Sequence, residues 1–261
     1  MKIRTGTLRS YKEQGEKFAC LTSYDHQTAQ IFDQAGVAVL LVGDSASNAV
    51  LGNRDTLPVT LEEMIVFGKA VSTGAKNALV VLDLPFGSYE VSAEQAVQSS
   101  ILAMKQSGVA AVKLEGARIE QIKAVVDAGI PVMGHVGFTP QSVHALSGYK
   151  VQGRDTENAD RIMTECLAIQ EAGAFAIVLE MVPAALAKEI TATLHIPTIG
   201  IGAGKDCDGQ ILVWTDFAGL DNRSPSFSKQ YLNVRELLGQ AASDYVSEVK
   251  QGTFPDPAKN F

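Results

Sequence analysis

The stretch VLLVGDSAS (39–47) joins a continuous apolar run to an aspartate and a serine. An uninterrupted run such as VLLV is typical of a parallel strand that is covered on both faces, because an exposed face would carry alternating polar residues. An ionised carboxylate is costly to bury unless another group compensates its charge. Asp44 at the end of this run therefore raises the question of what compensates it.

Similar short apolar runs recur along the 261-residue chain. Most are continuous rather than alternating, which predicts parallel strands covered by helices. Including the first run, the expected strands are 18–25, 37–45, 78–85, 110–116, 131–137, 174–182, 197–204 and 209–216.

Amphipathic segments separate most of these runs. Thr60 and Glu63 have the spacing of a capping box, and Gly36 and Gly108 are placed as C-caps. The expected helices are 26–36, 60–76, 92–108, 118–129, 158–173 and 183–194. This alternation predicts an α/β fold of the (β/α)8 TIM-barrel type, with a doubly wound open sheet as the alternative.

We expect one barrel domain over residues 1–261, with a short N-terminal helix and a C-terminal tail in GTFPDPAKNF (252–261). Two long connections, 138–158 and 217–231, would lie on the face formed by the carboxyl ends of the strands. The glycines of GIGAG (200–204) lack the spacing and the following helix of a dinucleotide-binding fingerprint. They are interpreted as tight-turn or close-packing residues.

Composition excludes several function classes. Hydrophobic residues make up 46% of the chain, which is ample for a large core, and the net charge of −7 argues against a nucleic-acid partner. No apolar stretch is long enough to span a membrane, and the basic N-terminal segment lacks the apolar centre of a signal peptide, so a cytoplasmic protein is expected. Three separated cysteines without a CxxC pair and four histidines without HExxH spacing indicate neither a disulfide framework nor a zinc site.

Carboxylates end four of the expected strands: Asp44, Asp83, Glu115 and Glu180. In a barrel these ends point to one mouth, where two like charges ~4 Å apart would repel by about 4 kcal/mol. Such a cluster needs protons or a cation, and oxygen ligands favour Mg²⁺ over Zn²⁺. The alternative is that each acid is a helix cap or a solvated loop residue.

Lys113 precedes Glu115 by two residues, so both side chains lie on the same side of their strand. A lysine on a buried strand needs an anionic partner, either a substrate or a carboxylate in an internal salt bridge. His135, at the end of the fifth expected strand, is a candidate substrate or supporting contact, with a structural hydrogen-bonding histidine as the alternative.

The chain resembles the ketopantoate hydroxymethyltransferase family over nearly its whole length. The matching stretches are LTSYD (21–25), LLVGDS (40–45), TLPVT (56–60), DLPFGSY (83–89), VKLEG (112–116), GHVGFTPQS (134–142), GYKVQGR (148–154), VLEMVP (178–183), IGIGAG (199–204) and DGQILV (208–213). The resemblance implies a Mg²⁺-dependent barrel of pantothenate biosynthesis that assembles as a large homo-oligomer, typically a decamer.

The resemblance also implies a reaction and roles for residues. A hydroxymethyl group would pass from 5,10-methylenetetrahydrofolate to 3-methyl-2-oxobutanoate, giving 2-dehydropantoate through a Mg-stabilised enolate. Glu180 matches the proposed general base. Expected metal ligands are Asp44, Asp83 and Glu115, the last of these either directly or through water. Expected substrate contacts are Asp44, Ser45, Asp83, Lys113 and His135.

The chain departs from the family pattern after GDS, where it reads ASN, and in GNRD (52–55). The segment LDNRSPSF (220–227) is too divergent for roles to be transferred. The nearest rival is a Mg²⁺-dependent carbon–carbon lyase of the phosphoenolpyruvate mutase and isocitrate lyase type, although the cysteine loop of those enzymes is absent. A non-catalytic scaffold is the rival from another class, and the intact strand-end acids argue against it.

Overall fold

The computed structural model describes residues 2–221 and 224–259, so parts of 220–227 and of the predicted tail lie outside the described residues. Within them, parallel strands pair in chain order and β8 pairs with β1, closing a barrel. The predicted (β/α)8 barrel is therefore confirmed, and the doubly wound alternative is wrong. The strands are β1 Phe18–Thr22, β2 Val39–Val42, β3 Leu79–Asp83, β4 Ala111–Lys113, β5 Val132–Gly137, β6 Ala176–Glu180, β7 Thr198–Ile201 and β8 Gly209–Leu212.

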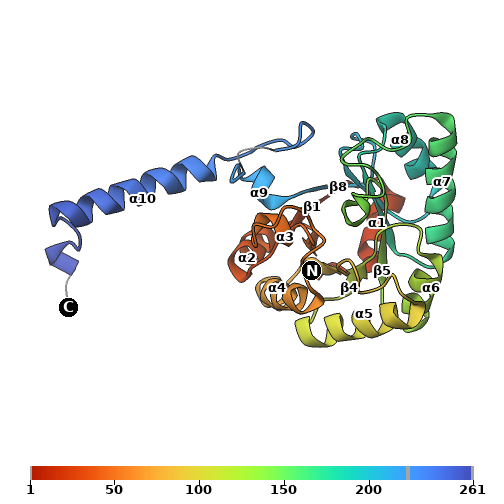
Figure 1. Cartoon of the computed structure of the whole chain (residues 1–261), viewed down its shortest axis with the longest axis horizontal. Helices are drawn as coiled ribbons and strands as arrows, with labels where there is room; N and C mark the ends of the chain where they lie inside the picture. The colour runs from red at the N-terminus through yellow and green to blue at the C-terminus, as the bar shows by residue number, and fades with distance from the viewer. Residues whose placement is uncertain (1, 222–223, 260–261) are drawn as a thin grey trace. The chain divides into compact units, whose positions relative to one another are not determined.

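Helices surround these strands on the outside (Figure 1). The six predicted helices are all present, and the Thr60–Glu63 capping box forms as expected. Gly108 is a left-handed C-cap, whereas the C-cap of the first of the six is Ala35 and Gly36 follows it with φ 88°. The helices of this part are α1 Thr5–Gln14, α2 His26–Gln34, α3 Ala46–Ala49, α4 Leu61–Gly74, α5 Ala93–Ser107, α6 Ile119–Asp127, α7 Thr156–Glu171 and α8 Ala184–Thr193.

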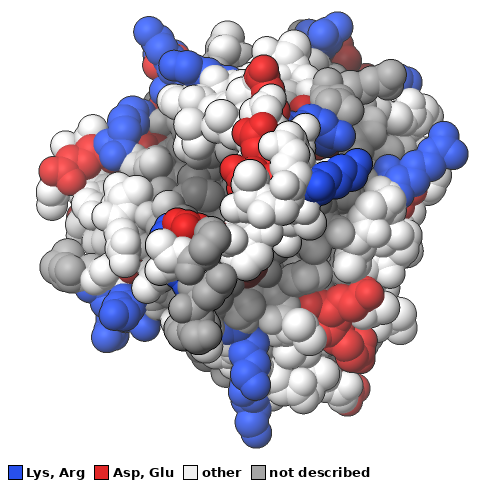
Figure 2. Space-filling model, turned by 90° about the vertical axis from the view of Figure 1, so that its left-hand side faces the viewer, with Lys and Arg blue, Asp and Glu red and all other residues white. Residues whose placement is uncertain are grey.

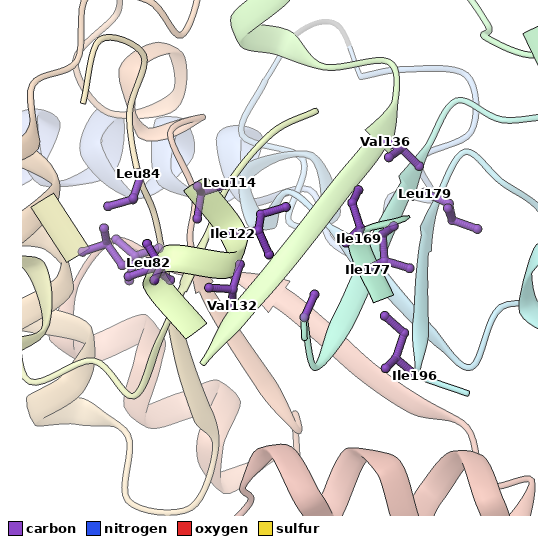
Figure 3. Packing of buried hydrophobic residues seen from close by; sticks show 14 of the residues in the cluster. Leu82, Leu84, Leu114, Ile122, Val132, Val136, Ile169, Ile177, Leu179 and Ile196 are labelled. Atoms are coloured by element: carbon purple, nitrogen blue, oxygen red, sulfur yellow. The ribbon is translucent and has the colours of Figure 1, made fainter. Parts of the chain in front are cut away.

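Alternate residues of the strands pack into two separate buried clusters. One set fills the barrel interior, where Leu8 of α1 joins it: Cys20, Val39, Leu41, Leu79, Val81, Ala111, Met133, Ala176, Val178, Ile199 and Ile211. The other set packs between strands and helices and includes Leu82, Leu114, Val132, Ile177 and Leu179 (Figure 3). Because side chains alternate with a period of two, a residue two positions beyond an interior residue also faces inward.

The end of the barrel agrees with the expected pattern in one respect and differs in another. Residues 202–208, all of them described, join β7 directly to β8 without a helix, as the sequence indicated, but β8 ends at Leu212 rather than at residue 216. The short helix α9, Trp214–Phe217, occupies the rest of the predicted strand. The residues Trp214 and Asp216 at the end of this apolar run did not indicate that the strand would end and a helix begin there.

The chain divides into two compact units, Met1–Val213 and Trp214–Phe261. The second unit contains α9, the helix α10, Val234–Gln251, and a short 3₁₀ helix, Pro257–Lys259. None of the residues of α10 is buried, and its apolar side chains Leu237, Leu238 and Tyr245 are more than half exposed. This helix was not among the predicted elements, and the single-domain expectation stays a prediction.

Surface charge is mixed on the face shown in Figure 2, where Lys and Arg as well as Asp and Glu are scattered among uncharged residues. No described helix is long and apolar enough to cross a lipid bilayer. The three cysteines are buried and unpaired, as expected for packing residues.

Candidate active site

A cavity of about 100 Å³ lies at the carboxyl ends of the strands. Every residue that the sequence singled out lines it, so the structure brings the predicted set together: Asp44, Ser45, Asp83, Lys113, Glu115, His135 and Glu180. The placement is that of active sites in (β/α)8 barrels, which form on this face from the ends of several strands. The individual roles of these residues stay predictions.

The strand period explains how most of these side chains reach the cavity. Asp83 follows the interior residues Leu79 and Val81 at the same spacing, and His135 follows Met133. Lys113 and Glu115 continue from Ala111, as Glu180 continues from Val178, so they are the next inward positions of their rows. The apolar interior of the barrel thus ends in a charged layer. The alternation sets this layer, because a shift by one residue would turn these side chains toward the helices.

Lys113 is the buried cation at the centre of this layer. Its Nζ lies 2.6 Å from Asp83 Oδ1, 3.8 Å from Glu115 Oε1 and 3.2 Å from His135 Nδ1. Burial by itself lowers the pKa of the ammonium, but the charges of Asp83, Glu115 and Asp44 outweigh it and raise the pKa above its usual range. Lys113 therefore stays charged, and the internal salt bridge considered as an alternative is present.

Asp44 and Asp83 are neighbouring buried acids. The backbone N–H of Asp44 donates to Asp83 Oδ2 at 3.1 Å. Burial, and then the charges of Asp83 and Glu115, raise the pKa of Asp44 well above its ordinary value. Burial also raises the pKa of Asp83, although Lys113 opposes it. The pair thus binds protons or a cation more readily than two separate carboxylates would.

His135 lies between two acids. Its Nδ1 is 3.3 Å from Glu115 Oε1, and its Nε2 is 3.3 Å from Glu180 Oε2. Burial and the charge of Lys113 lower the pKa of the imidazole, but Glu115 and Glu180 raise it overall to about 9. For Glu115, His135 and Lys113 outweigh the effect of burial and lower the pKa of the carboxyl. His135 is therefore a charged link between the buried cluster and Glu180.

Gln141 is a site residue that sequence reasoning missed. It belongs to a 3₁₀ turn, Pro140–Ser142, in the long connection after β5. Its Nε2 donates to Asp44 Oδ2 and to the Leu84 carbonyl, both at 3.0 Å, and its backbone N–H donates to Glu115 Oε2 at 3.0 Å. It thus fixes two of the strand-end acids. A neutral amide in a long loop has no periodic signal that could have identified it.

Two tyrosines complete the polar framework and were likewise missed. Tyr89 donates its hydroxyl proton to Gln141 Oε1 at 2.5 Å and accepts from the backbone N–H of Glu115 at 3.2 Å. The Tyr24 hydroxyl lies 2.7 Å from Ser45 Oγ. Both rings are buried, and each holds the orientation of a neighbouring polar side chain. The stretches DLPFGSY and LTSYD contained them, but no role could be given from spacing.

Glu180 differs from the buried acids because its side chain is 16% exposed. It pairs in register with Gly137 of β5, which has φ 93°. A Cβ at position 137 would collide with the Glu180 carbonyl oxygen, so the two strand ends approach closely only because residue 137 is glycine. The close approach keeps Glu180 within reach of His135.

The donor set suits a hard divalent cation. Asp44 and Asp83 are buried acids whose pKa values are raised, mainly by burial and, for Asp44, also by the charges of Asp83 and Glu115. A bound cation would offset the cost of ionising them there. Glu115 is held by His135 and by the Gln141 N–H, which suits a role through water. Among the described residues, no group of three His, Cys, Asp or Glu side chains is arranged as a closed set of direct ligands.

The barrel and its acid-lined cavity define the class of protein, which is that of (β/α)8-barrel enzymes with the site at the carboxyl ends of the strands. The family model of ketopantoate hydroxymethyltransferase matches residues 2–257. The chain therefore belongs to the ketopantoate hydroxymethyltransferase family, as the sequence motifs implied.

Relatives support the same assignment. The chain is 56% identical to a 3-methyl-2-oxobutanoate hydroxymethyltransferase of Acidothermus cellulolyticus, over all of this chain and 97% of the relative. A protein of the same name from Nocardioides sp. is 54% identical over all of this chain and 89% of its own length. The counterpart from Corynebacterium glutamicum is 53% identical and 97% covered.

Solved structures resemble the chain at the level of the fold. A phosphonopyruvate hydrolase in complex with oxalate and Mg²⁺ aligns with a TM-score of 0.64 at 16% identity, covering 99% of this chain and 92% of the other. A 2,3-dimethylmalate lyase of the PEP mutase/isocitrate lyase superfamily aligns with a TM-score of 0.62 at 18% identity, covering 100% and 92%. At such low identity these matches show that the barrel fold is shared; they carry no information about the reaction.

Proposed function

We propose that the protein transfers a hydroxymethyl group from 5,10-methylenetetrahydrofolate to 3-methyl-2-oxobutanoate, giving 2-dehydropantoate. The observation that carries the proposal is one partly exposed carboxylate, Glu180, facing the same small cavity as a buried cluster of Asp44, Asp83 and Lys113. This arrangement separates a group that can take a proton from groups that can hold a charged substrate. Membership of the family supplies the identity of that substrate.

Lys113 and Ser45 hold the substrate carboxylate in this proposal. Lys113 is a charged donor inside the cavity, and Tyr24 orients the Ser45 hydroxyl. A buried ammonium binds an anion strongly because little water competes for it. The small volume of the cavity favours a compact oxo acid over a larger one.

Asp44 and Asp83 would hold Mg²⁺, with Glu115 acting through water. The ion, when bound, supplies Lewis-acid polarisation of the 2-oxo group. Gln141 keeps the Asp44 carboxylate in place, and the Asp44 N–H does the same for Asp83. These contacts keep the oxygen donors preorganised for a hard cation.

Glu180 removes the proton from C3 of the oxo acid, leaving a nucleophilic carbon. That carbon forms a bond to the one-carbon unit, both carbon–nitrogen bonds to the folate break, and a water molecule supplies the hydroxyl oxygen. The folate nitrogens take up the C3 proton and one proton of the water. His135, whose Nε2 lies 3.3 Å from Glu180 Oε2, positions the base.

The remaining features of the proposal concern assembly and location. We propose one barrel domain, a homodecamer, a cytoplasmic location and no nucleic-acid partner. The mixed surface charge, the net charge of −7 and the absence of a membrane-spanning helix among the described residues support the last two. The family resemblance supports the decamer.

The test is proton NMR of the purified protein with Mg²⁺, 3-methyl-2-oxobutanoate and methylenetetrahydrofolate in D₂O. A new hydroxymethyl signal that EDTA abolishes and added Mg²⁺ restores is expected. Deuteration of C3 without product would instead indicate an enzyme that enolises oxo acids, as the lyase alternative requires. If neither signal changes, the cluster only binds ligands and the transferase proposal is wrong.

A further inference from the structure

A second cavity, of about 490 Å³, begins one residue beyond the proposed base. It is several times larger than the acid-lined cavity and is formed mainly by the connection between β5 and α7. Its lining residues are Tyr149, Lys150, Val151, Gln152, Gly153, Arg154, Asp155, Asn158 and Met181. Glu180 lines the acid-lined cavity, and Met181, the next residue, lines the second one. The two cavities are therefore neighbours at the carboxyl end of β6.

Hydrogen bonds attach this connection to the end of β6. The N–H of Gln152 donates to the Met181 carbonyl at 2.9 Å, and the N–H of Phe138 donates to the Glu180 carbonyl at 2.8 Å. Met181 itself has φ 48°, an uncommon conformation for a residue with a side chain. Such a conformation persists only where the surroundings impose it, and it is often found at ligand sites.

Tyr149 offers a flat surface at the edge of this cavity. One face of its ring packs against Phe138 with a centroid separation of 4.8 Å, yet the residue is 66% exposed. Partial burial, and then the charges of Glu180, Asp55 and Asp44, raise the pKa of its hydroxyl. A planar ligand stacked here would reach toward Glu180.

Two positively charged side chains of this cavity are not neutralised by an acid within the described residues. Lys150 and Arg154 are exposed, and neither has an ion pair among the described residues. Asp155, the one acid of the lining, is the N-cap of α7. Its carboxylate accepts hydrogen bonds from the backbone N–H and the side-chain amide of Asn158 at 2.9 and 2.8 Å. The neighbouring cavity is acidic, so the pair of cavities is electrostatically divided.

We propose that this second cavity binds the folate co-substrate, with Tyr149 stacking on its aromatic part and Lys150 and Arg154 binding the carboxylates of its glutamate tail. The inference rests on the proposed function, because it takes the one-carbon donor to be a folate. A long ligand with a flat ring system and an anionic end fits this larger cavity, which is lined by Lys150 and Arg154, better than the small acid-lined cavity. Its reactive methylene would then face Glu180.

The test compares two ligands and two proteins by calorimetry under anaerobic conditions, with Mg²⁺ and 3-methyl-2-oxobutanoate present. Tetrahydrofolate carries the glutamate, and tetrahydropteroate lacks it. We expect wild-type protein to bind tetrahydrofolate roughly tenfold more tightly, as two partly screened charge pairs would give. In the double variant Lys150→Ala/Arg154→Ala this preference should disappear, while binding of tetrahydropteroate stays unchanged.

The matched control is Lys105→Ala/Lys123→Ala, which removes two exposed cations from α5 and α6. It should keep the full preference for tetrahydrofolate, so a general change of surface charge would be recognised. A preference that survives in the double variant, or that is absent from wild-type protein, overturns the proposal.

Tyr149 is tested separately. Tyr149→Leu should weaken binding of both ligands by roughly tenfold, because stacking on an aromatic ring does not depend on the glutamate. Tyr149→Phe should bind both as wild-type protein does. Equal affinity of Tyr149→Leu and wild-type protein would remove the ring from the site.

Proton exchange at C3 of the oxo acid distinguishes the two levels of the argument, because it requires no folate. If wild-type protein exchanges C3 and transfers the hydroxymethyl group but the variants bind folate normally, only this inference fails. If wild-type protein exchanges C3 but binds neither folate ligand, the folate donor itself is wrong and the inference falls with it.

Discussion

Each end of the barrel contains a lysine paired with an acid, partly buried at one end and fully buried at the other, and the surroundings of the two lysines differ. At the amino ends of the strands, Lys12 of α1 lies 2.9 Å from Asp208, which also accepts from the N–H of Thr198 at 2.9 Å. At the carboxyl ends, Lys113 faces several carboxylates in one cavity. At the amino ends, the charges of one lysine and one acid balance each other. At the carboxyl ends, several acids surround one lysine, so negative charge remains that a bound ligand could neutralise. The comparison separates a structural ion pair from a candidate site.

The largest expected effect follows from removing the base at the carboxyl end. Glu180→Gln keeps the size and the amide can still contact His135, but it cannot accept a proton from C3. Exchange of the C3 proton in D₂O, followed by NMR, should fall by roughly 10³-fold, within the range typical of general-base catalysis. Binding of the oxo acid, measured by calorimetry, should change little. Exchange at the wild-type rate would contradict the assignment.

The next effect concerns the metal. Asp83→Ala removes one of the two adjacent carboxylates and leaves Lys113 without its closest partner. Mg²⁺-dependent binding of 3-methyl-2-oxobutanoate should weaken by roughly 100-fold in calorimetric titrations. Asp208→Ala, which removes an acid from the opposite end, is the control and should bind normally if folded. Unaltered affinity in Asp83→Ala would exclude it from the metal site.

A smaller effect is expected at the amino end, and on stability alone. Lys12→Met leaves the carboxylate of Asp208 without its cation and breaks the hydrogen bond to the Thr191 carbonyl. The free energy of unfolding, measured with urea, should fall by about 2–3 kcal/mol. The transfer rate of the folded variant should equal that of wild-type protein. A loss of rate without a loss of stability would mean that this end also takes part in the reaction.

The last prediction is a pH dependence of stability. The pKa of His135 is raised to about 9 in the folded protein, so folding binds a proton between about pH 6.5 and that value. The stabilisation is complete below pH 6.5 and is lost as the pH rises through 9, with a slope of at most about 1.4 kcal/mol per pH unit.

Unfolding of metal-free protein at several pH values measures this slope. In His135→Asn it should be shallower, whereas Lys12→Met should lower stability without changing the slope. The raised pKa of Asp44 contributes loss in the same direction and remains in both variants. Equal slopes in wild-type protein and His135→Asn would show that the imidazole does not titrate in this window.

Sequence reasoning identified the parts of the molecule that follow a period. The strand runs and the acids at their ends were predictable because burial of a parallel strand produces continuous apolar residues, and Asp83 or Glu180 interrupts such a run visibly. Gln141 was not predictable, because its bond to Asp44 joins positions 97 residues apart and depends on how a long loop folds back.

The C-terminal helix shows a different kind of miss. Helix α10 has apolar residues such as Leu237, Leu238 and Tyr245 at helical spacing, so its signal was present in the sequence. A barrel interpretation that counts strands gave this segment no place, since it follows β8 and lies outside the alternating pattern. Periodicity beyond the last strand has to be assessed independently of the fold it follows.

Gly137 has a consequence for how this site tolerates change. His135 Nε2 lies 3.3 Å from Glu180 Oε2, and this approach depends on the absence of a side chain at residue 137, which faces the Glu180 carbonyl oxygen. Only glycine, which has no Cβ, allows β5 and β6 to approach this closely. A search for residues with reactive side chains would therefore overlook this position. A random mutagenesis screen for lost activity should therefore recover substitutions of Gly137 as readily as substitutions of the charged residues that line the cavity.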